Sequence, residues 1–544
     1  MCGIWAILGY QNPEYAAYVS RLSNRGPEFT TYVDLSGVRA SLGFTRLAIN
    51  GLTPAGNQPF VNNNTYLVCN GEIYNYKELA KRWNISLAEG TSDCAVIPHL
   101  ARHLGMTELC RTLDGVFAFV YVDKEANTVT VARDPYGVRP LFEAIYMKNN
   151  QSYTVWASEV KALPNDYISV KPFPPGTWRR YWLDTGFMFE SQKYHTVPHT
   201  KMALFSYPVH RSESAEALRT ALTNAVKKRL LSDRPVGALL SGGLDSSLVA
   251  AIAARYLRME GKKLSTFSIG MPGSTDLAYA QKVADFIGSD HHSVVMTPED
   301  FLAAIPNVIR DIESYDITTV RASVGNWLLG KYIRERTDIK VVFNGDGSDE
   351  IGGGYLYFYA APSDEEFEAE SERLLNEIHM YDVLRSDRSM AAHGLEARTP
   401  FLDKSVVATW RAIDTGFRRP RHANADGRGQ AMEKTILREA FQVENYLPFD
   451  VLWRRKEAFS DGVSSASDSW YKRCQEHANM NGYVANEETT VINSPKTAEA
   501  GWYRGLFEEN YGAKAAALIP HMWMPKWVAG TNDPSARTIT FYTQ

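Results

Sequence analysis

The chain has 544 residues, which is too long for one hydrophobic core and predicts two or more domains. Its net charge is -4 and its Lys and Arg residues are scattered, which argues against a nucleic-acid-binding protein. No apolar stretch is long enough to span a membrane, and five cysteines without a C-x-x-C pair favour a reducing, cytoplasmic location without structural zinc.

Short strands and turns dominate the chain up to about residue 190. The apolar opening, residues 1–9, predicts a first strand; it lacks the basic start and cleavage site of a signal peptide, so we expect the native N-terminus here. Alternating apolar residues predict a hairpin of 116–122 and 128–132, whereas helical patterns are limited to 15–22 and 93–104. Strands that pair with neighbouring strands, with helices set apart, predict a layered α+β domain.

From residue 212 onward, helices and strands alternate. Such alternation predicts a parallel sheet with helices on both faces, and ligands of such sheets bind beyond the carboxyl ends of the strands. The expected elements are helices over 212–230, over 277–287 closed by Gly288, and after the N-cap Thr297, with strands over 264–269, 292–296 and 340–343.

Two further stretches are defined by their composition. The Pro- and His-containing stretch from about 196 to 211 is the expected linker, which gives domains over 1–200 and 206–544. The acidic stretch 364–372 is expected to be a solvated helix face without a function of its own.

A loop rich in glycine and serine follows the apolar run 236–240. It reads Ser241-Gly-Gly-Leu-Asp-Ser-Ser247 and precedes an alanine-rich helical pattern. The two glycines allow close backbone approach, amides at the helix start face an anion, and hydroxyls add donors. Asp245 can hold a magnesium ion. The loop therefore predicts chemistry on ATP, and an ordinary Ser/Gly turn is the alternative.

A second reactive group stands at the start of the chain. Removal of Met1 would leave Cys2 with a thiol and a free α-amine, a nucleophile and a base in one residue. The thiol has a pKa of ~8.5 and the amine one of ~7.7 to 8.0, so some thiolate and a competent base coexist at neutral pH. A buried structural cysteine is the alternative, because free cysteine is among the most buried residue types.

Short motifs occur along nearly the whole chain and are weakest near the C-terminus. They are Cys2-Gly-Ile, Arg25-Gly-Pro, Arg46-Leu-Ala-Ile49, Asn70-Gly-Glu-Ile-Tyr-Asn75, Ser92-Asp93, Arg133-Asp-Pro-Tyr-Gly137, the loop 241–247 and the segment Gly345 to Glu350. Together they resemble the glutamine-hydrolysing asparagine synthetase family. The resemblance implies an αββα N-terminal-nucleophile glutaminase domain of the class II glutamine amidotransferases, followed by an α/β parallel-sheet synthetase domain of the ATP pyrophosphatase type.

In the first domain, the matching residues predict a glutamine site. Arg46 can hold the substrate carboxylate in a bidentate pair, and Asp93 and Glu72 can bind its ammonium group. Attack by the thiolate creates an oxyanion, which Asn70 and the backbone amide of Gly71 would stabilise, as the family implies. Surface salt bridges and an ordinary turn are the alternatives for these residues taken singly.

In the second domain, the matching residues predict an ATP site. Asp349 resembles the family's second metal carboxylate, so Asp245 and Asp349 would hold Mg²⁺ against the pyrophosphate. Lys456 would steady the phosphates and the developing charge, with Asp403 near it. The positions that match ATP-binding residues of the family are Leu240, Ser241, Gly242, Gly243, Asp245, Ser246, Ile269, Asn344 and Gly345. Those that match aspartate-binding residues are Thr318, Thr319 and Arg321. For these three, a capped helix start with a surface arginine is the alternative.

This chain departs from the family pattern at three places. Asn344 and Asp346 stand where the family has Ser and Glu, Glu28 replaces an Asp, and the segment 352–354 is richer in glycine. The family's glutamate is implicated in ammonia attack. Asp346 keeps its charge but is one methylene shorter, so its reach bears on the rate of amide formation.

Together these features predict ATP-dependent synthesis of asparagine. The aspartate side chain would become an adenylate with release of pyrophosphate, and ammonia released at Cys2 would reach it through a dry passage between the domains. The alternatives are a related amidotransferase for another carboxylic acid and a catalytically impaired relative. The expected ligands are glutamine, aspartate, ATP and Mg²⁺, with no nucleic acid or membrane partner. The family is often dimeric, which leaves a homodimer open, because no residue here decides the oligomeric state.

Overall fold

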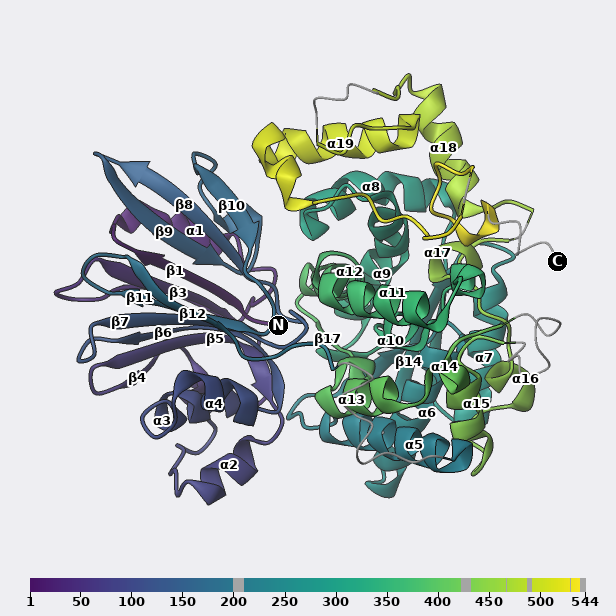
Figure 1. The fold of residues 1–544 in the computed structure, drawn as a ribbon, viewed down its shortest axis with the longest axis horizontal. Coiled ribbons are helices and arrows are strands. Elements are labelled where there is room, and N and C mark those ends of the chain that lie inside the picture. Colours follow the sequence, from purple (N-terminus) through teal and green to yellow (C-terminus); the bar gives the residue numbers. More distant parts are fainter. Residues whose placement is uncertain (199–209, 422–431, 466, 487–491, 529, 539–544) are drawn as a thin grey trace.

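A computed structural model describes residues 1–198, 210–421, 432–465, 467–486, 492–528 and 530–538. Two domains lie side by side, one built from antiparallel sheets and the other from a parallel sheet surrounded by helices (Figure 1). Most of the expected linker, with the boundaries at 200 and 206, lies outside the described residues.

The N-terminal domain consists of two stacked antiparallel sheets of six strands each. The expected first strand is present as β1 (Gly3–Leu8), and the expected hairpin as β6 (Gly115–Asp123) and β7 (Thr128–Arg133). In order across the first sheet, the strands are β10 (Ser169–Pro172), β8 (Phe142–Lys148), β9 (Gln151–Ala157), β1 (Gly3–Leu8), β3 (Ala40–Arg46) and β2 (Phe29–Asp34). Across the second they are β12 (Met188–Lys193), β11 (Thr177–Trp182), β7 (Thr128–Arg133), β6 (Gly115–Asp123), β5 (Thr65–Ile73) and β4 (Phe60–Asn62).

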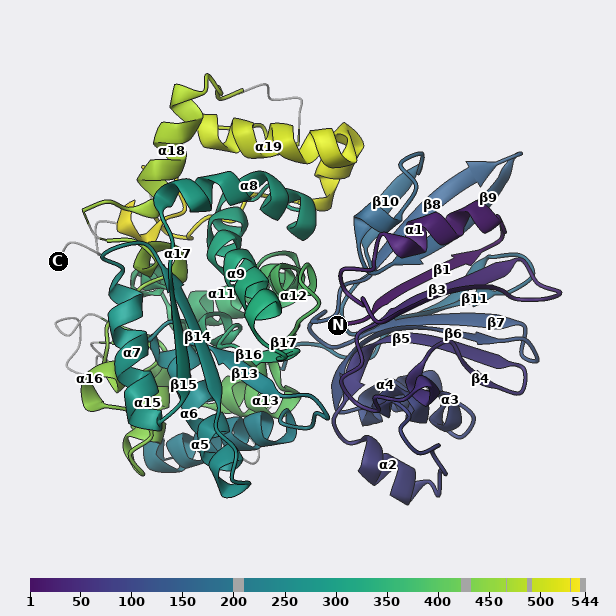
Figure 2. The same ribbon diagram turned by 180° about the vertical axis from the view of Figure 1, so that it is seen from behind.

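Helices cover both outer faces of this sandwich (Figures 1 and 2). Because side chains alternate along a strand, β1 serves two layers: Ile4 and Ala6 join the core between the sheets, whereas Trp5 packs with Val19 and Leu22 on the outer face. The layers are thus αββα, as predicted. The covering helices are α1 (Ala16–Ser20) on the first sheet and α2 (Tyr76–Arg82), α3 (Val96–Leu100) and α4 (Met106–Thr112) on the second.

The C-terminal domain contains a five-stranded parallel sheet. Its order is β15 (Asp290–Val295), β14 (Ser265–Gly270), β13 (Val236–Leu239), β16 (Val341–Phe343) and β17 (Glu396–Arg398). The chain moves outward from β13 to β15 and then returns to the other side of β13. The loops after β13 and β16 therefore leave the sheet side by side, which is the point where open α/β sheets bind ligands.

Helices pack on both faces of this sheet, as the alternation predicted. The local signals are also confirmed: Gly288 closes its helix in the left-handed conformation at φ 65°, and Thr297 and Asp300 form a reciprocal capping box. One face is covered by α5 (Arg211–Lys228), α6 (Leu244–Met259) and α7 (Thr275–Ile287), and the other by α8 (Pro298–Ile312) and α9 (Ile317–Arg336).

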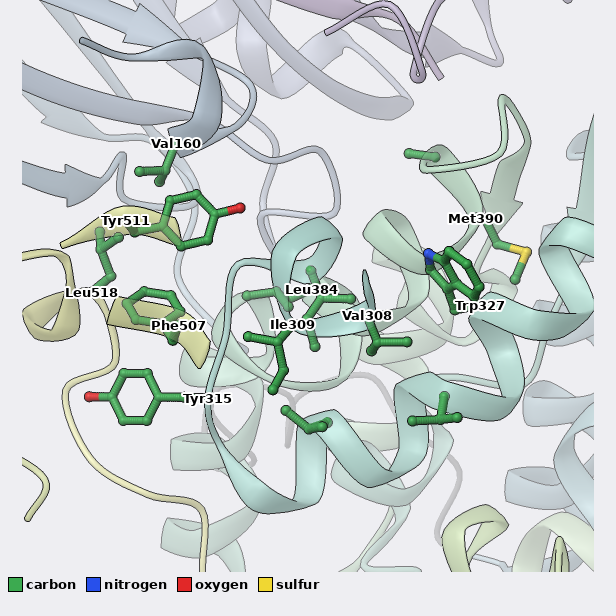
Figure 3. Packing of buried hydrophobic residues seen from close by; sticks show 14 of the residues in the cluster. Val160, Val308, Ile309, Tyr315, Trp327, Leu384, Met390, Phe507, Tyr511 and Leu518 are labelled. Atoms are coloured by element: carbon green, nitrogen blue, oxygen red, sulfur yellow. The ribbon is translucent and has the colours of Figure 1, made fainter. Parts of the chain in front are cut away.

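The two domains share an apolar core at their boundary. In Figure 3, Val160 of the N-terminal domain lies beside Tyr511, the last residue of α19 (Ala498–Tyr511), with Leu518 close by. All three side chains are buried in one cluster. Within the described parts of the chain, we find no helix whose length and hydropathy would suit a membrane span.

The acidic stretch 364–372 differs from the sequence expectation. It forms the start of α11 (Asp364–Glu377), but Glu370 is completely buried. The helical period turns Glu370 inward with Phe367, where Glu370 accepts a hydrogen bond of 2.7 Å from the Tyr357 hydroxyl and pairs with Arg373 at 2.7 Å. A purely solvated face is therefore wrong for this helix.

We predict that Glu370→Ala destabilises the protein. The change leaves the buried Tyr357 hydroxyl without its acceptor and Arg373 with Glu377 alone, which costs ~1–3 kcal/mol and lowers the melting temperature. Glu366→Ala is the control, since Glu366 is 48% exposed and its surface pair with Lys526 contributes less than ~1 kcal/mol. Equal melting temperatures of the two variants, followed by circular dichroism, would contradict the buried role.

Candidate active site

Cys2 stands just before β1, near the N-terminus, which lies at the end of the sandwich that faces the C-terminal domain (Figure 1). Its thiol points toward the Leu47 carbonyl at 3.7 Å, and its own carbonyl accepts a 2.9 Å hydrogen bond from Arg25 Nε. Burial raises the pKa of the Cys2 thiol to about 11, while the N-terminal ammonium opposes this rise and Glu72 adds to it. The thiol is therefore protonated at neutral pH and needs a base to become a nucleophile.

The side chain of Asn70 is buried without a partner. It lies on β5 with 1% of its surface exposed, and neither Oδ1 nor Nδ2 has a hydrogen-bond partner among the described residues. Buried polar atoms are paired in almost all native structures, so this amide is available to a ligand. The next residue, Gly71, must be small, because a Cβ there would lie 2.6 Å from the Val116 carbonyl oxygen.

Arg46 ends β3 as a buried cation without a carboxylate partner in the described chain. Its guanidinium donates to Thr53 O at 2.7 Å, to Asn57 Oδ1 at 2.8 Å and to the Gly51 carbonyl. All three acceptors are neutral, so the charge itself is not compensated. A substrate carboxylate would compensate it, as the predicted glutamine site requires.

Glu72 and Asp93 supply the opposite charge. Asp93 accepts hydrogen bonds from the Ile73 amide and, at 2.9 Å, from the Ser92 hydroxyl. Burial raises the pKa of Asp93 to about 6, and burial followed by the charge of Asp93 raises the pKa of Glu72 well above its usual range. Two acids in one buried place favour a cationic ligand, such as the ammonium group of an amino acid.

The loops after β13 and β16 enclose a cavity. They touch closely, since a Cβ on Gly345 would lie 2.7 Å from the Ser246 amide nitrogen. Gly242 belongs to the first loop but packs against α7, where a Cβ would come within 2.4 Å of Ala280 N, and it does not line the cavity. The other predicted ATP-binding residues do line it: Leu240, Ser241, Gly243, Asp245, Ser246, Ile269, Asn344 and Gly345.

Two acids and two lysines form the charged floor of this cavity. Lys434 Nζ lies 2.6 Å from Asp245 Oδ2 and 2.5 Å from Asp349 Oδ1, and Lys456 Nζ lies 2.6 Å from Asp349 Oδ2. Burial alone would raise the pKa of Asp349, but the two lysines outweigh it and hold that pKa well below its usual range. The sequence analysis missed Lys434, which belongs to no motif and joins Asp245 from 189 positions away.

Asp245 and Asp349 fit a magnesium site. Both present carboxylate oxygens to one point, marked by Lys434 Nζ. Mg²⁺ commonly takes one or two protein carboxylates and completes its shell with water and substrate phosphates. The described residues contain no group of three or more His, Cys, Asp or Glu side chains arranged for a metal.

The residues predicted to bind aspartate fall into two groups. Within the part of the chain that the structure describes, the buried hydroxyls of Thr318 and Thr319 have no hydrogen-bond partner, and Thr318 lines the cavity. Arg321, by contrast, is buried and paired with Glu499 at 2.5 Å and Asp533 at 2.7 Å. It is neither a free cation nor the surface arginine of the alternative interpretation, because residues of the C-terminal segment neutralise it.

Asp346 and Asn344, the two departures from the family pattern, contact each other. Asn344 Nδ2 donates to Asp346 Oδ2 at 2.8 Å and to the Ser386 hydroxyl at 2.6 Å. Arg385, a cavity residue that the sequence analysis missed, lies 3.8 Å from the Asp346 carboxylate. Burial raises the pKa of Asp346, and Arg385 opposes that shift. The longer side chain at position 344 thus holds the shorter acid in place.

Asp403 does not lie beside Lys456 as expected. Its ion pairs are with Lys228 and Arg229, both at 2.5 Å, and it caps α13 (Lys404–Ala412) by accepting from the Ser405 amide. It stabilises the packing of that helix on α5 rather than the phosphate site.

Comparison with known proteins identifies the family. The model of the glutamine amidotransferase domain matches residues 1–192, and the model described as asparagine synthase matches 217–371 and 360–523. The glutamine-hydrolysing asparagine synthetases of Pongo abelii and Homo sapiens are each 42% identical over 571 aligned positions, covering 100% of this chain and 99% of theirs. The chain belongs to the glutamine-hydrolysing asparagine synthetase family. The Gallus gallus asparagine synthetase is 39% identical over the same share of both chains.

We predict that Asn70→Ala impairs glutamine hydrolysis. Loss of the unpartnered amide would lower kcat for glutamate formation by about 10²–10³ with little change in KM, because an oxyanion donor acts in the transition state. Asn75→Ala is the matched control, since the Asn75 side chain is already bonded to Thr112 O and Asp114 N. A glutaminase assay in which both variants lose the same activity would contradict the assignment.

Proposed function

We propose that this chain makes asparagine from aspartate and glutamine at the expense of ATP, with glutamate, AMP and pyrophosphate as the other products. The observation that carries the proposal is the pair of sites. One presents, in the same domain, the Cys2 thiol and the unpartnered buried amide of Asn70, and the other presents two loops with paired acids and lysines. Membership of the asparagine synthetase family supports the same reaction.

The first half-reaction releases ammonia at Cys2. Removal of Met1 would free the α-amine of Cys2 to accept the thiol proton. An α-amine has a pKa of ~7.7 to 8.0, so a fraction of it is a neutral base at pH 7. The thiolate attacks the amide carbon, Asn70 and the Gly71 amide stabilise the oxyanion, and ammonia leaves. Water then hydrolyses the thioester to glutamate.

The second half-reaction activates aspartate. Its side-chain carboxylate attacks the α-phosphorus of ATP and displaces pyrophosphate, giving an aspartyl adenylate. Lys456 and Lys434 place two cations where negative charge accumulates, and amides at the start of α6 face the phosphates. Asp245 and Asp349 would hold Mg²⁺, which neutralises phosphate charge when bound. Thr318 and Thr319 offer hydroxyls to aspartate.

Ammonia completes the reaction by displacing AMP from the adenylate. Asp346 accepts a proton as the nitrogen attacks. Ammonia in bulk water would be protonated, so we infer a dry passage through the interface between the domains. Glu72, a candidate glutamine residue of the first domain, contacts Arg398 of the second at 3.4 Å and so lies at the domain interface, which supports such a passage. We place the enzyme in the cytoplasm, where its five free cysteines stay reduced.

The decisive test is a product assay on the purified protein with ATP, Mg²⁺, aspartate and glutamine. We expect equal amounts of asparagine, AMP and glutamate, and no asparagine from glutamine in Cys2→Ala. With ammonium chloride in place of glutamine, Cys2→Ala should still form asparagine and AMP. Glutamate without asparagine would point to another acceptor acid or an impaired synthetase site, and absence of all products would contradict the proposal.

We predict that Asp346→Asn separates activation from amide formation. The carboxamide keeps the hydrogen bond with Asn344 but cannot take a proton, so asparagine formation falls by about 10²-fold or more. Exchange of labelled pyrophosphate into ATP, which reports adenylate formation, should persist. Asp346→Glu restores the longer acid of the family and should form asparagine. Parallel loss of exchange and synthesis in Asp346→Asn would show a structural role instead.

A further inference from the structure

Arg398 belongs to the synthetase domain but its side chain reaches the glutamine site. It ends β17, the edge strand of the parallel sheet, and is buried. Its Nη2 lies 3.4 Å from Glu72 Oε2 of the other domain, and its Nε donates to Glu396 Oε1 at 2.9 Å. Nη1 donates to the carbonyls of Arg229 and Leu231, the latter at 2.7 Å.

The guanidinium is fixed on one side and free on the other. Nε and Nη1 are held by acceptors of the synthetase domain, whereas Nη2 has no hydrogen-bond partner among the described residues. A buried nitrogen without a partner is uncommon, and here it points toward the carboxylate of Glu72. The domain that carries Arg398 thus presents a rigid cation to the other domain's site.

The charges around Glu72 show what this cation does. Burial raises the pKa of Glu72, and Asp93 and then Glu396 raise it further; Arg398 and then Arg139 lower it. The charge of Glu72 raises the pKa of the nearby Cys2 thiol, and Asn50 donates a hydrogen bond to the Glu72 carboxyl group. These groups come from β17, from the residue before β1, from the loops after β3 and β7, and, in the case of Asp93, from the short helix η3 (Asp93–Ala95). Arg398 is the largest opposing charge.

We propose that Arg398 is a positioning residue of the glutamine site, whose guanidinium holds the Glu72 carboxyl group in place for the ammonium group of glutamine. The glutamine site is then completed by the synthetase domain. This inference rests on the proposed function, because it assumes that glutamine binds beside Cys2.

The same residue also contacts the ATP loop. The backbone carbonyl of Arg398 accepts a 3.1 Å hydrogen bond from the amide of Asn344, the first residue after β16. Phe343 and Arg398 are register partners in the parallel pair of β16 and β17. The backbone that carries the ATP loop therefore fixes the position from which the guanidinium reaches Glu72.

The test is the glutaminase activity of Arg398→Gln between pH 6 and 9. Without the cation, the pKa of Glu72 rises and Glu72 stays neutral to higher pH. We expect KM for glutamine to rise about tenfold or more, kcat to stay within about threefold, and the rising limb of kcat/KM to move to higher pH. Asparagine formation from ammonium chloride should stay near the wild-type rate, which also reports a correct fold.

Two further variants make the result specific. Arg398→Lys keeps the charge and should recover most of the affinity. Arg411→Gln removes another buried arginine, one that pairs with Glu368 at 2.6 Å within the same domain, and should leave the pH profile unchanged. In a Glu72→Gln background, Arg398→Gln should have little further effect on KM, because the two changes remove one interaction.

Several outcomes would overturn the inference. These are an unchanged KM and pH profile in Arg398→Gln, equal losses with glutamine and with ammonium chloride, or additive effects of the Glu72 and Arg398 changes. If Arg398→Gln does not fold, the same criteria apply to Arg398→Met, which also removes the charge, while Arg398→Lys should stay near wild type. Failure of the proposed function is distinguished by wild type, which would then form no asparagine from glutamine or from ammonium chloride, whereas failure of this inference alone leaves both reactions of wild type intact.

Discussion

A buried ionic network holds the two domains in register. Asp387 of the synthetase domain pairs with Arg25 at 2.7 Å and Arg139 at 3.5 Å, and Glu396 pairs with Arg139 at 2.9 Å. Removing such charges from water is expensive unless each finds its partner. A shifted docking of the domains would leave charges buried and unpaired, so this network specifies one arrangement more strictly than the apolar contacts around Val160 can.

Both reactive centres are attached to this network. Arg25 also binds the carbonyl of Cys2, which fixes the nucleophile, and Glu396 also holds Arg398, which reaches Glu72. The interface thus stabilises the docked domains and places the glutaminase residues with the same side chains. Because β17 continues the sheet from β16, the register of the interface is also the register of the ATP loop.

Local signals could be predicted from the sequence, whereas distant pairings could not. The hairpin of β6 and β7, the capping box at Thr297 and the loop at Ser241 depend on neighbouring residues, and the structure contains all three. Lys434 meets Asp245 only in the folded chain, and Arg321 meets Glu499 and Asp533 in the same way. These partners are far apart in the sequence, so no local motif spacing could predict the pairs. Glu370 shows the related limit that an acidic composition does not reveal which helix face turns inward.

The two sites treat charge in opposite ways, and their ligands explain the difference. In the cavity beside the two loops, Lys434 already neutralises Asp245 and Asp349. If ATP bound there with Mg²⁺, the lysine could turn to the phosphates while the cation took the two carboxylates. No buried charge would then be left without a partner. At the glutamine site, Arg46 has only neutral acceptors, and Glu72 and Asp93 lie near each other. In the proposed function, a zwitterion would supply one charge to each end and its amide to Asn70. Its carboxylate would give Arg46 the anionic partner that the described residues do not provide, which would favour an amino acid over a simple amine.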